Sequence, residues 1–153
     1  MKRVLVKSVH DAFDYVMEHY YPAGLEEFSE KKDTYAVISV QDTHTGGFGL
    51  SFSKNKFCMD VLTLYFDDVV RETEGAVLFT KEMAEEIIDF IFLNRDAETL
   101  LIHCYGGQSR SMAVGAFALK MLGLDNSRYF LEADPNPVVY DTLVSAWKER
   151  SGR

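Results

Sequence analysis

Two short segments, "YAVISV" at residues 35–40 and "TLLIHC" at residues 99–104, are apolar almost without interruption. A strand with one solvent-facing side alternates apolar and polar residues, so a continuous apolar run is typical of a strand covered on both faces. Such strands occur mainly in parallel sheets that lie between layers of helices. These two segments therefore favour an α/β fold built around a buried parallel sheet.

The spacing of apolar residues predicts the remaining elements. Two further strands are expected at residues 4–9 and 61–66. Helices are expected from a capping-box spacing at Ser8 to a stop before Pro22, and over residues 80–95, 110–123 and 136–147. The segment 41–56 is predicted to be a long loop with room for a short hairpin, and 67–79 to be irregular. The predicted fold class is α/β, with a central, mostly parallel sheet of four to five strands flanked by helices.

Length and charge limit the classes of function. The chain has 153 residues, of which 47% are hydrophobic, so we expect one domain over residues 1–153. The formal net charge of −8 argues against a nucleic-acid partner, which normally requires a basic surface. We find neither a signal peptide nor an apolar run of the roughly 20 residues that a membrane span requires. With two cysteines, the sequence suggests a reduced, cytoplasmic setting.

The segment "HCYGGQSRS", residues 103–111, follows the strand at 99–104 and opens the helix at 110–123. Ligands of such folds bind beyond the carboxyl ends of the strands. Gly106 and Gly107 let the backbone turn its amide groups inward, and the helix N-terminus adds its dipole. The guanidinium of Arg110 matches two oxygens of a tetrahedral anion. The loop therefore predicts a phosphate site made by Tyr105, Gly106, Gly107, Gln108, Ser109 and Arg110.

Cys104 lies at the base of this loop. The amides that hold a phosphate would also stabilise a thiolate, and cysteines in such positions have pKa values lowered from about 8.5 to roughly 3.5–7.5. A thiolate that faces a bound phosphorus atom is placed as a nucleophile. We expect His103 to bond nearby backbone and shape the loop, and Ser111 to donate to the sulfur. The alternative is that Cys104 is an ordinary core cysteine.

These residues resemble the signature of the cysteine-dependent protein tyrosine phosphatases. His103 and Cys104 are followed by five residues and then by Arg110 and Ser111. Gly107 at the third position after the cysteine is similar to the compact dual-specificity branch of that family. The order of "LTLYFDD", a helix and "TLLIHC" upstream also resembles that branch. The resemblance implies a phosphatase-like fold and a cysteinyl-phosphate intermediate.

The resemblance further implies a general acid on a separate loop. Family members with a doubled aspartate at this place commonly use the second, which predicts Asp68, with Asp67 as the alternate. An aspartate can protonate the leaving oxygen and later activate water. Without the phosphatase function, the same pair would be a solvated strand end or a helix cap.

The predicted function is hydrolysis of a phosphomonoester, most simply phosphotyrosine, with or without phosphoserine and phosphothreonine. The substrate would be a phosphorylated protein or a small phosphomonoester. The loop interior "YGGQS" contains no Lys or Arg, which disfavours inositol phosphates and RNA ends. No cofactor is expected, and the four histidines share no spacing typical of metal ligands.

Three alternative functions stay open at this stage. The first is a phosphoinositide or other small-molecule phosphatase, the second a rhodanese or arsenate type of thiolate enzyme, and the third a phosphate-binding module without catalysis. Cys58 is interpreted as a half-buried bystander, with a Cys58–Cys104 disulfide as a further option under oxidation. His44 belongs either to the pocket rim or to a plain surface loop. Asn136 is interpreted as a helix cap, with contact to the loop as the alternative.

Overall fold

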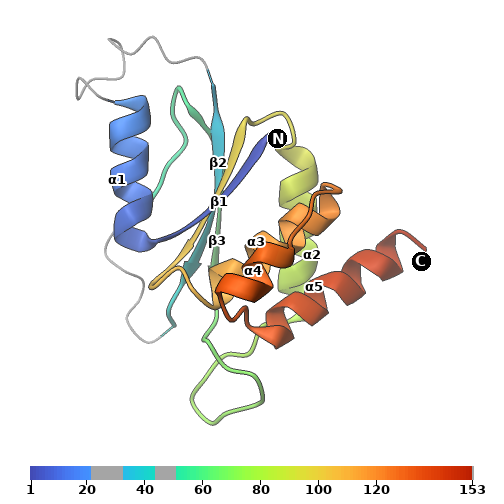
Figure 1. Ribbon diagram of the computed structural model, residues 1–153. Helices are drawn as coiled ribbons and strands as arrows, with labels where there is room; N and C mark the ends of the chain where they lie inside the picture. Colours follow the sequence, from blue (N-terminus) through green and yellow to red (C-terminus); the bar gives the residue numbers. More distant parts are fainter. Residues whose placement is uncertain (22–32, 44–50, 153) are drawn as a thin grey trace.

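The sheet of this protein consists of four parallel strands. In the computed structural model, which describes residues 1–21, 33–43 and 51–152, the strands pair in the order β1-β4-β2-β3 (Figure 1). Their bounds are β1 (Arg3–Ser8), β2 (Tyr35–Gln41), β3 (Cys58–Tyr65) and β4 (Thr99–Cys104). All residues of β2 and β4 are buried, because these strands are central and covered on both faces. The predicted α/β fold with a parallel sheet is confirmed.

Helices cover both faces of the sheet. One face packs against α1 (Val9–Tyr20), and the other against α2 (Lys81–Leu93), α3 (Arg110–Met121) and α5 (Pro137–Arg150) (Figure 1). The larger core lies on the side of α2, α3 and α5. The smaller core, between α1 and the sheet, contains two tyrosines in contact, Tyr20 and Tyr35, whose ring centroids lie 4.7 Å apart with the ring planes tilted by 33°. The sequence thus produces three layers, as the apolar runs indicate.

The structure corrects several predicted boundaries. β3 begins at Cys58, three residues before the predicted start, and α2 and α3 each end two residues early. A short helix, α4 (Ser127–Glu132), was missed because none of its residues is buried, so its sequence carries no apolar period. Residues 67–79 contain neither helix nor strand, as expected. Of the segment predicted to be a loop with room for a short hairpin, residues 44–50 lie outside the described residues and residues 51–57 contain no strand.

The parallel register brings the ends of three strands to one edge of the sheet. Ser39 of β2 pairs with His103 of β4, and Gln41 of β2 pairs with Tyr65 of β3. The segments that follow these strands therefore begin side by side, at the edge where α3 starts. In open parallel sheets this edge is where ligands bind.

The loop after β4 packs directly against the turn between β1 and α1. Gly107 has a φ of +70°, and a Cβ atom built there would lie 2.5 Å from the backbone carbon of Lys7 and 2.5 Å from the nitrogen of Ser8. The amide of Val9 donates to the carbonyl of Tyr105 over 3.3 Å. Only glycine combines this conformation with so close an approach of two backbones.

We therefore expect Gly107→Ala to lower the free energy of unfolding by at least about 2 kcal/mol, because left-handed strain and a backbone clash add together. Urea denaturation followed by circular dichroism measures this change. The matched control is Gly106→Ala, since a Cβ atom at Gly106 would meet no heavy atom within 4 Å. Equal stability of the two variants would contradict the close approach at Gly107.

Candidate active site

Cys104, the last residue of β4, holds its sulfur beneath the loop that leads into α3. Its side chain is buried, with 3% exposed. The amide of Gly107 donates to Sγ over 3.2 Å, and Oγ of Ser111, in the first turn of α3, lies 3.0 Å from the same sulfur. Ser109 at the N-cap makes no side-chain hydrogen bond to the first turn of the helix. The sulfur therefore lies among polar donors at a helix N-terminus, which is an environment that suits an anion.

Arg110, the first residue of α3, is turned into the protein. It is 6% exposed, and its Nη1 donates to the carbonyl oxygen of Phe66 over 2.8 Å. The same nitrogen forms an ion pair with Oδ1 of Asp42 at 2.8 Å. Because Phe66 follows β3 and Asp42 follows β2, Arg110 connects three loops at one edge of the sheet.

Asp42 is a candidate site residue that the sequence analysis missed. A signal was available: Asp42 follows a predicted buried strand and so lies at the same edge as Cys104. The pairing itself was not readable, because the partner lies 68 residues further along the chain. Its carboxylate, together with the carbonyl of Phe66, fixes the Nη1 end of the Arg110 guanidinium.

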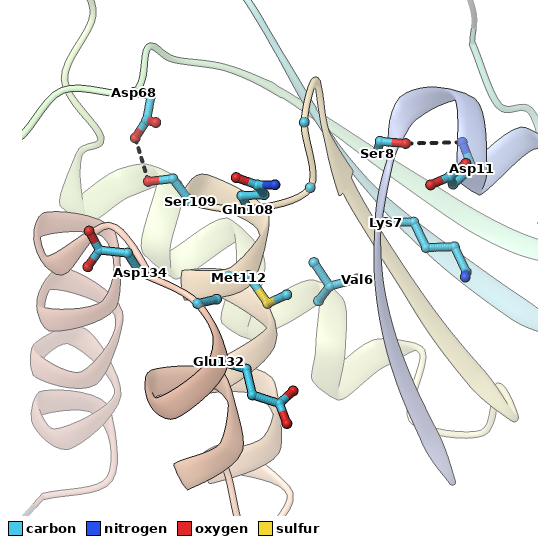
Figure 2. A pocket seen from close by; sticks show the side chains of 13 residues that line it. Val6, Lys7, Ser8, Asp11, Asp68, Gln108, Ser109, Met112, Glu132 and Asp134 are labelled. Carbon is cyan, nitrogen blue, oxygen red and sulfur yellow. Dashed lines mark hydrogen bonds between the residues drawn. The ribbon is translucent and has the colours of Figure 1, made fainter.

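Asp68 faces the loop that follows β4. Its Oδ1 accepts hydrogen bonds from Oγ of Ser109 and from Nδ2 of Asn136, each over 2.8 Å, and Figure 2 shows the contact with Ser109. The carboxylate is exposed, so a ligand in the loop can reach it. Asp68, one of the two predicted aspartates, therefore contacts this loop through Ser109.

Asp67 has a different set of partners. Its carboxylate oxygens accept from Oγ1 of Thr43 over 2.9 and 2.8 Å, and one of them accepts from the amide of Val77 over 2.7 Å. The amide of Asp67 donates in turn to the carbonyl of Val77. The two bonds between Asp67 and Val77 join the two ends of the irregular segment 67–77. Asp67 thus shapes the loop that carries Asp68.

Asn136 is both a helix cap and a contact of the site. Its Oδ1 accepts from the amides of Val138 and Val139 at the start of α5, as predicted. Its buried Nδ2 donates to Asp68, and its backbone amide donates to the carbonyl of Ser109 over 3.1 Å. The two interpretations of Asn136 therefore hold together, and α5 is tied to both loops of the site.

His103 lies under the loop in a buried chain of hydrogen bonds. Oγ of Ser39 lies 2.7 Å from Nε2 of His103. The same oxygen accepts a hydrogen bond from the side-chain amide of Gln41 over 2.7 Å, so the Ser39 hydroxyl can donate its own proton to the imidazole. Nδ1 lies 3.4 Å from the carbonyl oxygen of Cys104. Burial lowers the pKa of His103 from 6.5 to about 4, so the ring is neutral at pH 7. These contacts agree with the expected shaping role.

The loop residues 106–109, together with Asp68, line a pocket of about 730 Å³. Tyr105 is exposed, Gly107 is buried, and neither Cys104 nor Arg110 lines the pocket. The pocket therefore lies beside the loop, and the sulfur lies beneath it. The contacts of the sulfur, rather than the pocket, mark the candidate chemical centre, because they bring a thiol and hydrogen-bond donors together.

Cys58 is remote from this site. It is 1% exposed rather than half-buried, and burial raises the pKa of its thiol to about 11. Cys58 and Thr99 both pair with Tyr35, so Cys104 is displaced from Cys58 by about 16 Å along the strands at 3.3 Å per residue. A disulfide allows about 7 Å between Cα atoms, so the expected option of a Cys58–Cys104 bridge is wrong. His44 lies outside the described residues.

In residues 1–21, 33–43 and 51–152, no group of three or more His, Cys, Asp or Glu side chains is arranged to hold a metal ion. None of the helices in the described part of the chain combines the length and apolar character needed to cross a membrane.

Solved structures with a similar fold are protein phosphatases and their relatives. Human DUSP28 matches with a TM-score of 0.55 and 15% identity, over 97% of this chain and 94% of that one. Tk-PTP in its active form matches with a TM-score of 0.53 and 21% identity, over 100% and 93%. PTPMT1 in complex with PI(5)P matches with a TM-score of 0.56 and 13% identity, over 99% and 94%.

These likenesses show that the chain has the fold of the compact, dual-specificity type of cysteine-dependent phosphatase. The predicted resemblance is thereby confirmed at the level of the fold. A scan of protein-family models finds no match to the sequence. A search of curated proteins likewise finds no significant match.

The depressed pKa of His103 predicts how stability depends on pH. The unfolded chain binds a proton at His103 near pH 6.5, whereas the folded protein binds it only near pH 4. The contribution of the neutral His103 ring to the free energy of unfolding is therefore fully present above about pH 6.5 and is lost as the pH falls towards 4. Between pH 7 and pH 5 we expect a loss of about 2 kcal/mol in the free energy of unfolding.

Urea denaturation at both pH values, on the original protein and on His103→Asn, measures this contribution. The difference between the two proteins isolates His103 from the carboxylates that titrate in the same range. An identical pH dependence in both would contradict a buried, neutral imidazole.

Proposed function

We propose that this protein is a cysteine-dependent phosphomonoester hydrolase that acts on phosphotyrosine in proteins, with or without phosphoserine and phosphothreonine. One observation carries the proposal. The buried sulfur of Cys104 lies 3.2 Å from the Gly107 amide and 3.0 Å from the Ser111 hydroxyl, at the N-terminus of α3. A sulfur in this place can hold negative charge and face an anion bound in the loop.

In the first step the loop amides and Arg110 bind the phosphate dianion. The Cys104 thiolate attacks phosphorus in line with the leaving oxygen, so an S–P bond forms as the P–O bond breaks. Asp68, in its protonated form, gives its proton to the leaving oxygen. The products of this step are the free alcohol and a cysteinyl-phosphate.

In the second step a water molecule attacks the phosphorus of this intermediate. Asp68, now a carboxylate, takes a proton from the water, and the P–S bond breaks to release inorganic phosphate. Ser111 donates a hydrogen bond to the departing sulfur, which stabilises the thiolate. The fixed donors stabilise the charge of both transition states without rearranging.

The hydrogen-bond partners support Asp68 rather than Asp67 as the acid. Asp68 contacts Ser109 of the loop, whereas Asp67 is occupied by Thr43 and Val77. His103 is neutral and bound to Ser39, which supports a role in shaping the loop. Asp42, paired with Arg110, is proposed to position the guanidinium.

The alternative functions are less well supported. PTPMT1 of similar fold was solved with PI(5)P, but the loop interior of this chain, residues 105–109, contains no Lys or Arg for additional phosphates. A rhodanese type of enzyme has no use for a proton donor at the position of Asp68. A binding module without catalysis has no need of both Cys104 and Arg110.

We further propose that residues 1–153 form one catalytic domain and that it works in the cytoplasm, because both cysteines are free.

We expect Cys104→Ser to lower kcat on an aryl phosphate by roughly four orders of magnitude or more, because the hydroxyl lacks the nucleophilicity of a thiolate. Steady-state hydrolysis of para-nitrophenyl phosphate at pH 6–7 measures the loss. Cys58→Ser makes the same chemical change far from the loop and is expected to keep kcat within a factor of about three. Full activity of Cys104→Ser would remove the proposal.

A second comparison distinguishes the two aspartates. Asp68→Asn is expected to lower kcat by about 10²–10⁴, because the leaving oxygen loses its proton donor. Rates on aryl phosphates whose leaving groups differ in pKa show the cause: the defect shrinks when the leaving group needs no proton. Asp67→Asn, the matched control, retains this proton transfer and lacks such a dependence. A leaving-group dependence confined to Asp67→Asn would reverse the assignment.

A further inference from the structure

The pocket beside the loop has walls from four parts of the chain. One wall is the loop itself, residues 106–109, with Asp68 above it (Figure 2). The opposite wall is the turn from β1 into α1, and the floor includes Met112 of α3. The last wall is the end of α4 and the start of its connection to α5, at residues 132–134. At about 730 Å³ the pocket is larger than a phosphate needs and can hold neighbouring parts of a substrate.

The charge of this pocket has the same sign as that of a phosphate, so it favours a cationic group beside the phosphate. Asp11, Asp68, Glu132 and Asp134 bring four carboxylates to its lining. The lining contains one basic residue, Lys7, and Figure 2 shows its side chain directed away from the loop. The Lys7 ammonium lies over the ring of Tyr15, 5.4 Å from the ring centroid.

Two of the carboxylates are available to a ligand. Glu132 is paired with Arg128, and Asp68 accepts from Ser109. The carboxylates of Asp11 and Asp134, in contrast, are exposed and have no hydrogen-bond or ion-pair partner within residues 1–21, 33–43 and 51–152. They lie on opposite sides of the pocket, one on α1 and one just before α5.

We propose, on the basis of the function proposed above, that this pocket selects protein substrates with a lysine or arginine next to the phosphorylated residue. With the phosphate bound in the loop, the neighbouring residue starts about 3.8 Å along the peptide, and its side chain is long enough to cross the pocket. A cationic group there meets Asp11 and Asp134. A glutamate, or a second phosphate, meets repulsion instead.

The size of the preference follows from the exposure of these carboxylates. Exposed charge pairs are weak one at a time, so two pairs together give roughly a tenfold difference between a basic and an acidic neighbour at low salt. Salt screens such pairs beyond about 8 Å at physiological ionic strength. The preference must therefore shrink as salt increases, unlike a preference that arises from shape.

The test uses two phosphotyrosine peptides that differ in the residues beside the phosphotyrosine, arginine in one and glutamate in the other. We expect kcat/KM to be about tenfold higher for the arginine peptide at low salt, and the ratio to fall in 0.5 M salt. In the variant Asp11→Asn/Asp134→Asn the ratio falls to about twofold. The control Glu82→Gln/Glu86→Gln removes two exposed carboxylates of α2, one of them also in the first turn of a helix, and keeps the full ratio.

Several results would overturn the inference. Equal kcat/KM values for the two peptides in the original protein would do so. An equal fall of the ratio in the control variant would show an effect of net charge and not of this pocket. Faster hydrolysis of a phosphoinositide than of the arginine peptide would contradict the charge argument. If the original protein hydrolyses para-nitrophenyl phosphate but does not distinguish the two peptides, this inference alone is refuted. If the original protein hydrolyses no ester at all, the proposed function is refuted with it.

Discussion

The close approach of Gly107 to the turn between β1 and α1 is the contact on which the rest of the site depends. The backbone of Gly107 lies against Lys7 and Ser8, where a Cβ atom would be 2.5 Å from both residues. This approach holds the Gly107 amide 3.2 Å from the Cys104 sulfur. Lys7 and Ser8 end β1, which pairs with β4 in the sheet. The contact with Gly107 therefore fastens the loop after β4 to the neighbouring strand. A backbone packed in this way cannot easily open, so the donors stay in place around the sulfur.

The site is then completed by segments that converge from the rest of the chain. Arg110 is held by the carbonyl of Phe66 and by Asp42, at the ends of β3 and β2. Asp68 is held by Ser109 of the loop and by Asn136, the cap of α5. Each of these bonds joins residues at least 41 positions apart in the chain. Charged and polar groups that are fixed in this way lose little conformational entropy when a ligand binds, which is the basis of preorganisation.

Sequence reasoning found the parts of the site that lie close together in the chain. His103, Cys104, Arg110 and Ser111 follow one another within nine residues, so the strand, loop and helix that carry them could be predicted together. The same reasoning missed Asp42, whose partner is remote, and α4, whose residues are all outside the core. It also allowed a bridge between two cysteines that the strand register separates.

The sequence by itself determined the layered α/β fold and the loop that holds the Cys104 sulfur, because these depend on local periodicity and on residues a few positions apart. Tertiary structure alone decided which aspartate faces the loop, what holds the arginine and which charges surround the neighbouring pocket. These features depend on the order of strands in the sheet and on where the loops between them end. Local patterns do not carry that information, since many strand orders can bury the same apolar faces.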